Sequence, residues 1–207
     1  MDGTICSPHC PPVPDPSLGV HPSIHRMVSH SPKSGQFKQG YIQIYCGTGK
    51  GKTTAALGLS LRILLTGGSV FFAQFFKGVE TAELGLCSLC DRFSIEQYGT
   101  GNFIAGLPGS EDIAAARKGL RYCHDALTSG CFDLIVLDEI LLCVAYQIFS
   151  VEELISILES RKSHVEVVLT GRRVPSELVS AADLITEMKK VKHYFDQGVS
   201  ARKGIEY

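Results

Sequence analysis

Apolar positions along the chain follow two periods from residue 39 onward. Over residues 41–46 apolar residues alternate with polar ones, which is typical of a strand. Over residues 52–66 they recur every three or four positions, which predicts a helix, and 69–76 is an almost continuous apolar run, typical of a strand buried on both faces. These three segments predict a strand, a helix and a strand in succession.

The same two patterns continue through the rest of the chain. The further predicted strands cover 93–98, 132–138, 164–170 and 184–188, and the further helices cover 80–90, 110–129, 140–148, 150–161 and 175–182. Ser110 is expected to cap the long helix at 110–129, and Ser150 with Glu153 forms a capping box for another. Alternating strands and helices predict an α/β fold with a mostly parallel sheet and helices on both faces.

Residues 1–38 have a different composition and no apolar period. Seven of the nine prolines and four of the seven histidines lie in this segment. Because it cannot bury enough surface to offset its ordering entropy, we expect a flexible tail before a single domain at 39–207. Cys6, His9 and Cys10 could hold a metal with His21 or His25, but a solvated tail with incidental Cys and His is the favoured reading.

The first predicted strand runs into a glycine-rich turn that opens a helix. The turn and the helix start comprise Gly47, Thr48, Gly49, Lys50, Gly51, Lys52, Thr53 and Thr54. Glycines let backbone N–H groups curl around an anion, Lys52 adds a positive charge, and Thr53 offers a hydroxyl to Mg²⁺. The usual phosphate-loop pattern G-x-x-x-x-G-K-[ST] has Gly where Cys46 stands, so a glycine-rich turn without a ligand is the alternative.

A second functional signal lies at the end of the strand predicted at 132–138. Four apolar residues lead into Asp138 and Glu139. This form is typical of a Walker B strand, which brings a carboxylate to the Mg²⁺ on bound phosphates. The alternative is a strand that simply ends at a polar loop.

Several candidate residues follow the ends of different predicted strands. They are the turn at 47–54, Lys77, the glycine-containing loop at 99–109, Asp138 with Glu139, and residues 170–172. Ligands of parallel sheets bind at the carboxyl ends of the strands, so we expect these segments to form one site.

Composition narrows the functional classes. The net charge of −1 gives no footprint for nucleic acid, no apolar run reaches the length of a membrane span, and no secretion signal precedes the fold, so we expect a cytoplasmic protein. The eight cysteines are expected to be reduced. A structural zinc at Cys87 and Cys90, a lone C-x-x-C pair, is a minor alternative.

Over residues 39–207 the motifs closely resemble those of the P-loop ATP:corrinoid adenosyltransferases. The matching strings occur in family order at 47–56, 74–78, 136–139, 169–172, 192–196 and 203–207. The ending Lys-His-Tyr-Phe-Asp with Gly-Ile-Glu-Tyr is the most specific of them.

The resemblance implies an activity and a set of ligands. ATP and Mg²⁺ (or Mn²⁺) bind at the phosphate loop, and a reduced corrinoid, cob(I)alamin or a precursor, attacks the 5′ carbon of ATP. The products are an adenosylated corrinoid and triphosphate. The resemblance further implies a homodimer and a reductase that supplies electrons to the cobalt.

The resemblance also implies roles for particular residues. Lys52 and Glu139 are the expected catalytic residues, and Thr53 and Glu139, with Asp138 as the less favoured carboxylate, are the expected metal ligands. Lys50, Lys77 and Arg172 are candidates for further stabilisation of the phosphate charge.

One segment departs from the family pattern. After Thr100-Gly101 the family has Phe-Thr-Trp, whereas this chain has Asn102-Phe103-Ile104, so Phe103 is the candidate corrinoid contact.

Two other functions stay open. A P-loop kinase or NTPase would need a residue to position its acceptor or water, and none stands out. A nucleotide- or corrinoid-binding regulatory module would keep the fold without turnover.

Overall fold

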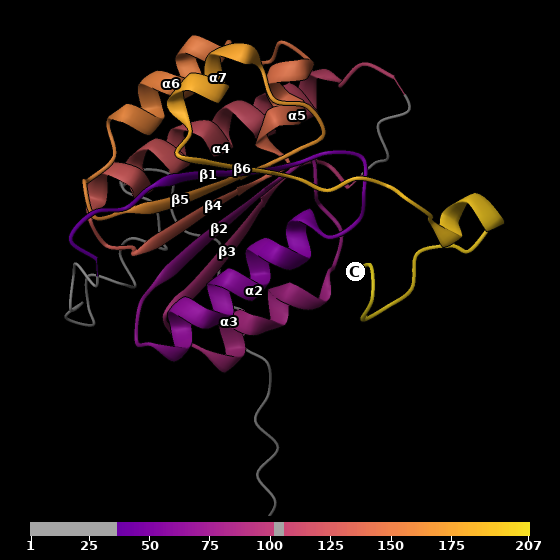
Figure 1. Cartoon of the computed structure of the whole chain (residues 1–207), viewed down its shortest axis with the longest axis horizontal. Coiled ribbons are helices and arrows are strands. Elements are labelled where there is room, and N and C mark those ends of the chain that lie inside the picture. The colour runs from indigo at the N-terminus through magenta and orange to yellow at the C-terminus, as the bar shows by residue number, and fades with distance from the viewer. Residues whose placement is uncertain (1–36, 102–105) are drawn as a thin grey trace, which may run out of the picture.

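The computed structural model describes residues 37–101 and 106–207, and Figure 1 shows its arrangement. Nearly all of the predicted tail at 1–38, with its Cys and His residues, therefore lies outside the described residues. The candidate corrinoid contact Phe103 also lies outside them. Neither prediction is tested by the fold.

The centre of the fold is a six-stranded sheet in which every pairing is parallel. Its spatial order is β3-β2-β4-β5-β1-β6. The strands are β1 (Ile42–Cys46), β2 (Val70–Phe75), β3 (Phe93–Tyr98), β4 (Leu134–Asp138), β5 (Glu166–Thr170) and β6 (Leu184–Glu187). All six predicted strands are confirmed, and the predicted α/β class is correct.

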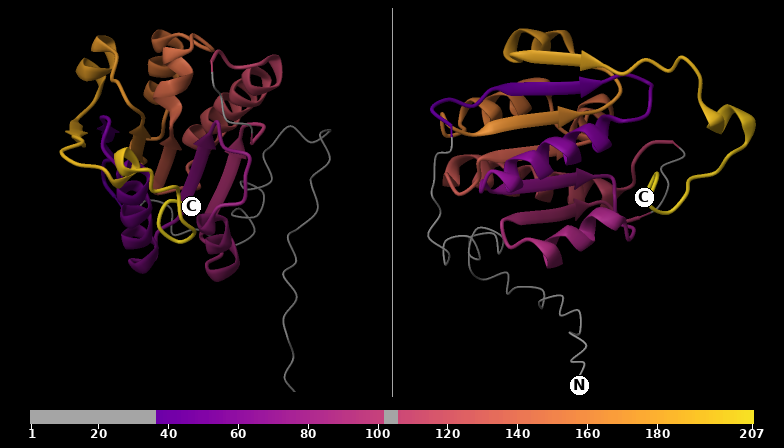
Figure 2. Two further views of the ribbon diagram at one scale, coloured as in Figure 1. Left: turned by 90° about the vertical axis from the view of Figure 1, so that its right-hand side faces the viewer. Right: turned by 60° about the horizontal axis from the view of Figure 1, so that its bottom comes forward.

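Helices cover both faces of this sheet, as predicted. In Figures 1 and 2, α2 (Lys52–Leu65) and the one-turn α3 (Leu86–Leu89) lie on one face. The other face is covered by α4 (Ser110–Ser129), α5 (Ile140–Ala145), α6 (Val151–Glu159) and α7 (Ser176–Ala181). Parallel strands joined by helical crossovers place their carboxyl ends at one edge of the sheet.

Three details of the helices differ from the sequence-based expectation. The helix expected at 80–90 is a 3₁₀ turn, η1 (Ala82–Gly85), followed by α3, and the short η2 (Tyr194–Gln197) was not predicted. Ser110 is not the cap of α4 but its first residue. The cap is Gly109, whose N–H donates to the Asp112 carboxylate at 3.3 Å, so Asp112 satisfies the helix end from inside the first turn.

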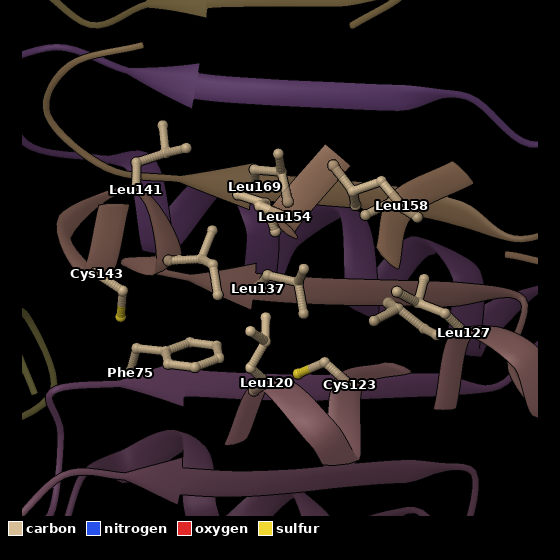
Figure 3. Close-up of a cluster of buried hydrophobic side chains, with 14 of the residues drawn as sticks. Phe75, Leu120, Cys123, Leu127, Leu137, Leu141, Cys143, Leu154, Leu158 and Leu169 are labelled. Atoms are coloured by element: carbon tan, nitrogen blue, oxygen red, sulfur yellow. The ribbon is translucent and has the colours of Figure 1, made fainter. Parts of the chain in front are cut away.

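The core consists of two clusters, one on each face of the sheet. The larger cluster joins β2, β4 and β5 to the helices α4, α5 and α6, and Figure 3 shows its centre around Leu137. The smaller one packs α2 against the other face. All six residues of β2 are buried, which confirms the strand expected to be covered on both sides.

Throughout residues 37–101 and 106–207, each helix is too short or too polar to span a bilayer.

Candidate active site

The turn after β1 is held in place by the segments that follow the two neighbouring strands. The N–H of Gly47 donates to the Arg172 carbonyl at 3.0 Å, and the N–H of Gly49 donates to the Met188 carbonyl at 2.7 Å. Gly47 has a φ of +102°, and a Cβ on it would lie 2.4 Å from the Met188 carbonyl oxygen. The glycines therefore let the turn pass directly against the backbone after β6.

Lys52 lies in the first turn of α2 and points back over the glycine turn. Its Nζ donates to the carbonyl oxygens of Gly47 at 2.9 Å and of Gly49 at 3.0 Å. An ammonium has three N–H donors, so these two bonds leave one donor for a phosphate oxygen. The first amide groups of α2 have no partners within the helix, and they add further donors for an anion.

Asp138, at the carboxyl end of β4, is fully buried and holds several polar groups around it. Its carboxylate accepts hydrogen bonds from Thr53 Oγ1 at 2.9 Å and from Thr170 Oγ1 at 2.7 Å. Lys77 Nζ lies 3.4 Å from its second oxygen. Asp138 thus links the first turn of α2 to the ends of β2 and β5.

Glu139, the next residue, differs from Asp138 in the hydrogen bonding of its carboxylate. Its backbone has a φ of +60° and its N–H donates to Thr170 Oγ1 at 2.8 Å. Within the described residues its carboxylate has no hydrogen-bond partner. Burial and the neighbouring Asp138 charge raise the pKa of Glu139, although Lys52, Lys77 and Arg172 oppose this shift. Glu139 is therefore the carboxylate available to a ligand.

Thr170 belongs to the candidate segment at 170–172, but the sequence analysis gave it no role of its own. It accepts from the Glu139 N–H and donates to Asp138, so it fixes both acidic residues relative to β5. Its position at the carboxyl end of a predicted strand was the available signal, but a threonine in that place is common.

Lys77 is shared between two carboxylates. Besides Asp138 it lies 3.5 Å from Glu83, which also accepts from Gln74 Nε2 at 2.8 Å. Burial alone would raise the pKa of Glu83, but the hydrogen bond from Gln74 and the charge of Lys77 lower it. Arg172 is exposed, and its guanidinium has no hydrogen bond or ion pair within residues 37–101 and 106–207.

The C-terminal segment also reaches the phosphate loop, which the sequence analysis did not predict. Lys50 Nζ lies 2.6 Å from Glu206 Oε1 and 2.9 Å from the Tyr194 hydroxyl. The residues around the resulting cavity of about 160 Å³ are Lys50, Gly51, Lys52, Thr53, Thr54, Glu139, Ile205 and Glu206. Residues 50–54 of the predicted loop and Glu139 therefore line one cavity, whereas residues 47–49, Lys77 and Arg172 do not line it.

The minor zinc alternative has no support in the described part of the chain. Cys87 and Cys90 form no disulfide, and no cluster of three or more Cys, His, Asp or Glu residues there could hold a metal.

A parallel sheet, a glycine turn that opens a helix with Lys and Thr, and an acidic pair at the carboxyl end of β4 define a phosphate-loop nucleotide-binding protein. Comparison with known proteins gives the particular family. The profile of the ATP:corrinoid adenosyltransferase BtuR/CobO/CobP family matches residues 38–207. The chain belongs to this family, and its activity is the ATP-dependent adenosylation of a corrinoid.

Curated relatives agree with the family profile. The corrinoid adenosyltransferase CobA of Salmonella typhimurium is 37% identical over 174 residues, which are 83% of this chain and 88% of the relative. The corrinoid adenosyltransferase of Escherichia coli is 35% identical over the same shares of both chains. That of a Sinorhizobium species is 31% identical over 82% of this chain and 81% of the relative.

Proposed function

We propose that the phosphate loop binds the triphosphate of ATP and that Lys52 stabilises it as it leaves. The observation that carries this assignment is the position of Lys52 Nζ, fixed by two carbonyl oxygens of the loop with one donor remaining. The 5′ carbon of the nucleotide then accepts an electron pair from the reduced cobalt of the corrinoid. A cobalt–carbon bond forms, the C5′–O bond breaks, and its electrons leave with the triphosphate.

In this reaction no side chain of the protein needs to act as the nucleophile. The nucleophile belongs to the substrate, so no activated Ser, Cys or His is needed. The protein binds and orients ATP and stabilises the growing charge on the leaving oxygen, a role in which fixed donors in a desolvated site are most effective. Lys52, the amide groups of α2 and Arg172 are the proposed donors and charges.

We further propose that Mg²⁺ (or Mn²⁺) binds between Thr53, Glu139 and the phosphates. The donor set fits, because these ions prefer hard oxygen ligands and commonly use one or two carboxylates together with substrate phosphates. The Asp138 oxygens already accept hydrogen bonds from Thr53 and Thr170, whereas the Glu139 carboxylate lines the cavity and accepts no hydrogen bond from any residue that the structure describes. Glu139 is thus the proposed ligand and Asp138 orients Thr53. When bound, the metal neutralises phosphate charge.

The corrinoid is proposed to bind next to the loop at 99–109, which follows β3 at the same edge of the sheet. Phe103 is the candidate contact on sequence grounds.

The family resemblance also supports a homodimer and a separate reductase that supplies electrons to the cobalt. Sedimentation of the purified protein tests the dimer, and reconstitution with candidate reductases tests the electron supply.

A single assay tests the reaction itself. The protein is incubated with ATP, Mg²⁺ and chemically reduced cobalamin, and the products are identified. Triphosphate together with a light-sensitive cobalt–carbon bond is the expected result. ADP and phosphate would instead indicate a kinase or NTPase, and binding without turnover would indicate a regulatory module.

A further inference from the structure

Lys50, two residues before Lys52, has no donor left for a phosphate. Its Nζ donates to the Tyr194 hydroxyl at 2.9 Å, to the Ile205 carbonyl at 3.1 Å and to Glu206 Oε1 at 2.6 Å. Since an ammonium has three donors, these contacts use all of them. All three acceptors belong to the C-terminal segment, which turns back toward the start of α2 after leaving β6 (Figure 2).

Glu206 is itself held from several sides. Its carboxylate accepts hydrogen bonds from the Tyr194 hydroxyl and from the backbone N–H of Arg202, the latter at 2.7 Å. The Arg202 guanidinium lies 4.8 Å from the centre of the Tyr194 ring, and its Nε lies 3.3 Å from Glu206. The bonds from Lys50 and Tyr194 hold the pKa of Glu206 well below its usual range. Lys50, Tyr194, Arg202 and Glu206 thus form one connected cluster.

The position of this cluster relates it to the nucleotide. Ile205 and Glu206 line the same cavity as Lys52, Thr53 and Glu139. Of the three charged residues of the cluster, Lys50 and Glu206 line this cavity, and their opposite charges balance there.

We propose that Lys50 is a positioning residue that docks the C-terminal segment on the phosphate loop and closes the triphosphate cavity, rather than a ligand of the phosphates. The inference rests on the proposed function in that it takes this cavity to bind the triphosphate. It reassigns Lys50 from charge stabilisation to the positioning of residues 194–206. The neighbouring Lys52 keeps the phosphate contact.

The test compares Lys50→Ala, Glu206→Gln and the double variant. Inorganic triphosphate binding is measured by calorimetry, and amide hydrogen exchange is measured over residues 194–206. If Lys50 and Glu206 act as one unit, each single variant weakens triphosphate binding by about fivefold, in the range of a partly exposed ion pair, and the double variant weakens it no further. Each variant also speeds exchange across the segment.

Matched controls lie in the same segment. Lys190 and Asp196 form an ion pair at 2.9 Å that contacts neither the loop nor the cavity lining. Lys190→Ala and Asp196→Asn should leave triphosphate affinity unchanged. In steady-state assays, Lys50→Ala and Glu206→Gln should raise the KM for ATP while kcat stays near that of the parent protein, which a general loss of folding would not produce.

Opposite behaviour of the two single variants would overturn the proposal. If Lys50 were a phosphate ligand, Glu206→Gln would free it and tighten triphosphate binding, whereas Lys50→Ala would weaken binding far more. Additive effects in the double variant would also contradict a single unit. Failure of the parent protein to bind triphosphate would count against the proposed function instead, and the hydrogen-exchange comparison would still decide whether Lys50 docks the segment.

Discussion

Lys50 and Lys52 lie two residues apart in the same loop, yet their surroundings differ. Lys52 bonds to carbonyl oxygens of its own loop, whereas Lys50 bonds to a segment more than 140 positions away in sequence. The local string Gly-Lys-Gly-Lys contains no signal that separates the two roles, because the difference arises from tertiary contacts.

Lys52→Ala should abolish turnover while the protein stays folded. The charge on the triphosphate grows as the C5′–O bond breaks, and losing one such fixed contact typically lowers kcat by about a hundredfold or more. Steady-state assays at saturating ATP check this, with Lys118→Ala on the exposed side of α4 as the control. Activity within about threefold of the parent protein would remove Lys52 from the mechanism.

Gly47→Ala should disrupt the phosphate loop. The new Cβ would lie 2.4 Å from the Met188 carbonyl oxygen at a φ of +102°, so the loop or the backbone after β6 must shift. We expect lost ATP binding and a lower melting temperature. Gly58→Ala in α2 is the control, since a Cβ there meets nothing within 4 Å and alanine favours the helix by about 1 kcal/mol. Equal melting temperatures for the two variants would contradict the assignment.

Asp138 and Glu139 should respond differently to removal of their charge. Glu139→Gln should raise the Mg²⁺ concentration needed for half-maximal activity and leave thermal unfolding nearly unchanged, because the Glu139 carboxylate only lines the cavity. Asp138→Asn should lower the melting temperature, because a fully buried acceptor of two hydroxyl hydrogen bonds is altered. Metal titrations and melting curves of both variants separate the two roles. The proposal would be reversed if Asp138→Asn raised the Mg²⁺ requirement and Glu139→Gln lowered the melting temperature.

At the scale of elements, the strands were predictable and several helix details were not. Apolar runs identified β2 and β4, because these strands are buried on both faces. Alternation of apolar and polar residues identified β1, which is buried mainly on one face. The segment at 82–89 has too few buried residues to sustain a regular helix, and it divides into η1 and α3. The η2 turn has no apolar period of its own, and its first residue, Tyr194, instead contacts Lys50 of the phosphate loop.

Leu137→Ala should be strongly destabilising. Leu137 is fully buried in β4 within the larger core cluster (Figure 3), and truncating such a side chain typically costs about 2–5 kcal/mol. Urea unfolding measures the change. Leu65→Ala at the end of α2 is the control, because that side chain is 79% exposed and its removal should cost little. A small effect at Leu137 would show that the core collapses around the gap.

Docking of residues 194–206 should resist mild acid. The pKa of Glu206 lies below the ordinary value of 4.5, so its contribution is fully present above that value and is lost only as the pH falls through the lower folded-state pKa. Amide protection of the segment, corrected for intrinsic exchange rates, should therefore be equal at neutral pH and at about pH 5. A loss of protection across that interval would mean that Glu206 is not held as described.

At the scale of the whole molecule, the sequence predicted at which edge of the sheet the candidate site lies, but not the contacts within it. A parallel sheet gathers the carboxyl ends of its strands, and this rule correctly brought the phosphate loop, Lys77 and the acidic pair together. The order of the strands was not predictable from periodicity, because it depends on which faces pack. Without that order, neither the contact of the loop with Met188 nor the role of Thr170 follows. The flexible tail at 1–38 stays a prediction.

The place of β1 between β5 and β6 has a consequence for synthesis of the protein. Tyr41 and its partner Glu166 are 125 positions apart, so at ribosomal rates β1 emerges about 6 to 25 seconds before the strand it pairs with. During that interval the phosphate loop lacks the backbone that shapes it. Nascent chains should acquire affinity for nucleotide only after β6 has emerged, and cellular ATP can then trap the completed fold without guiding the earlier steps.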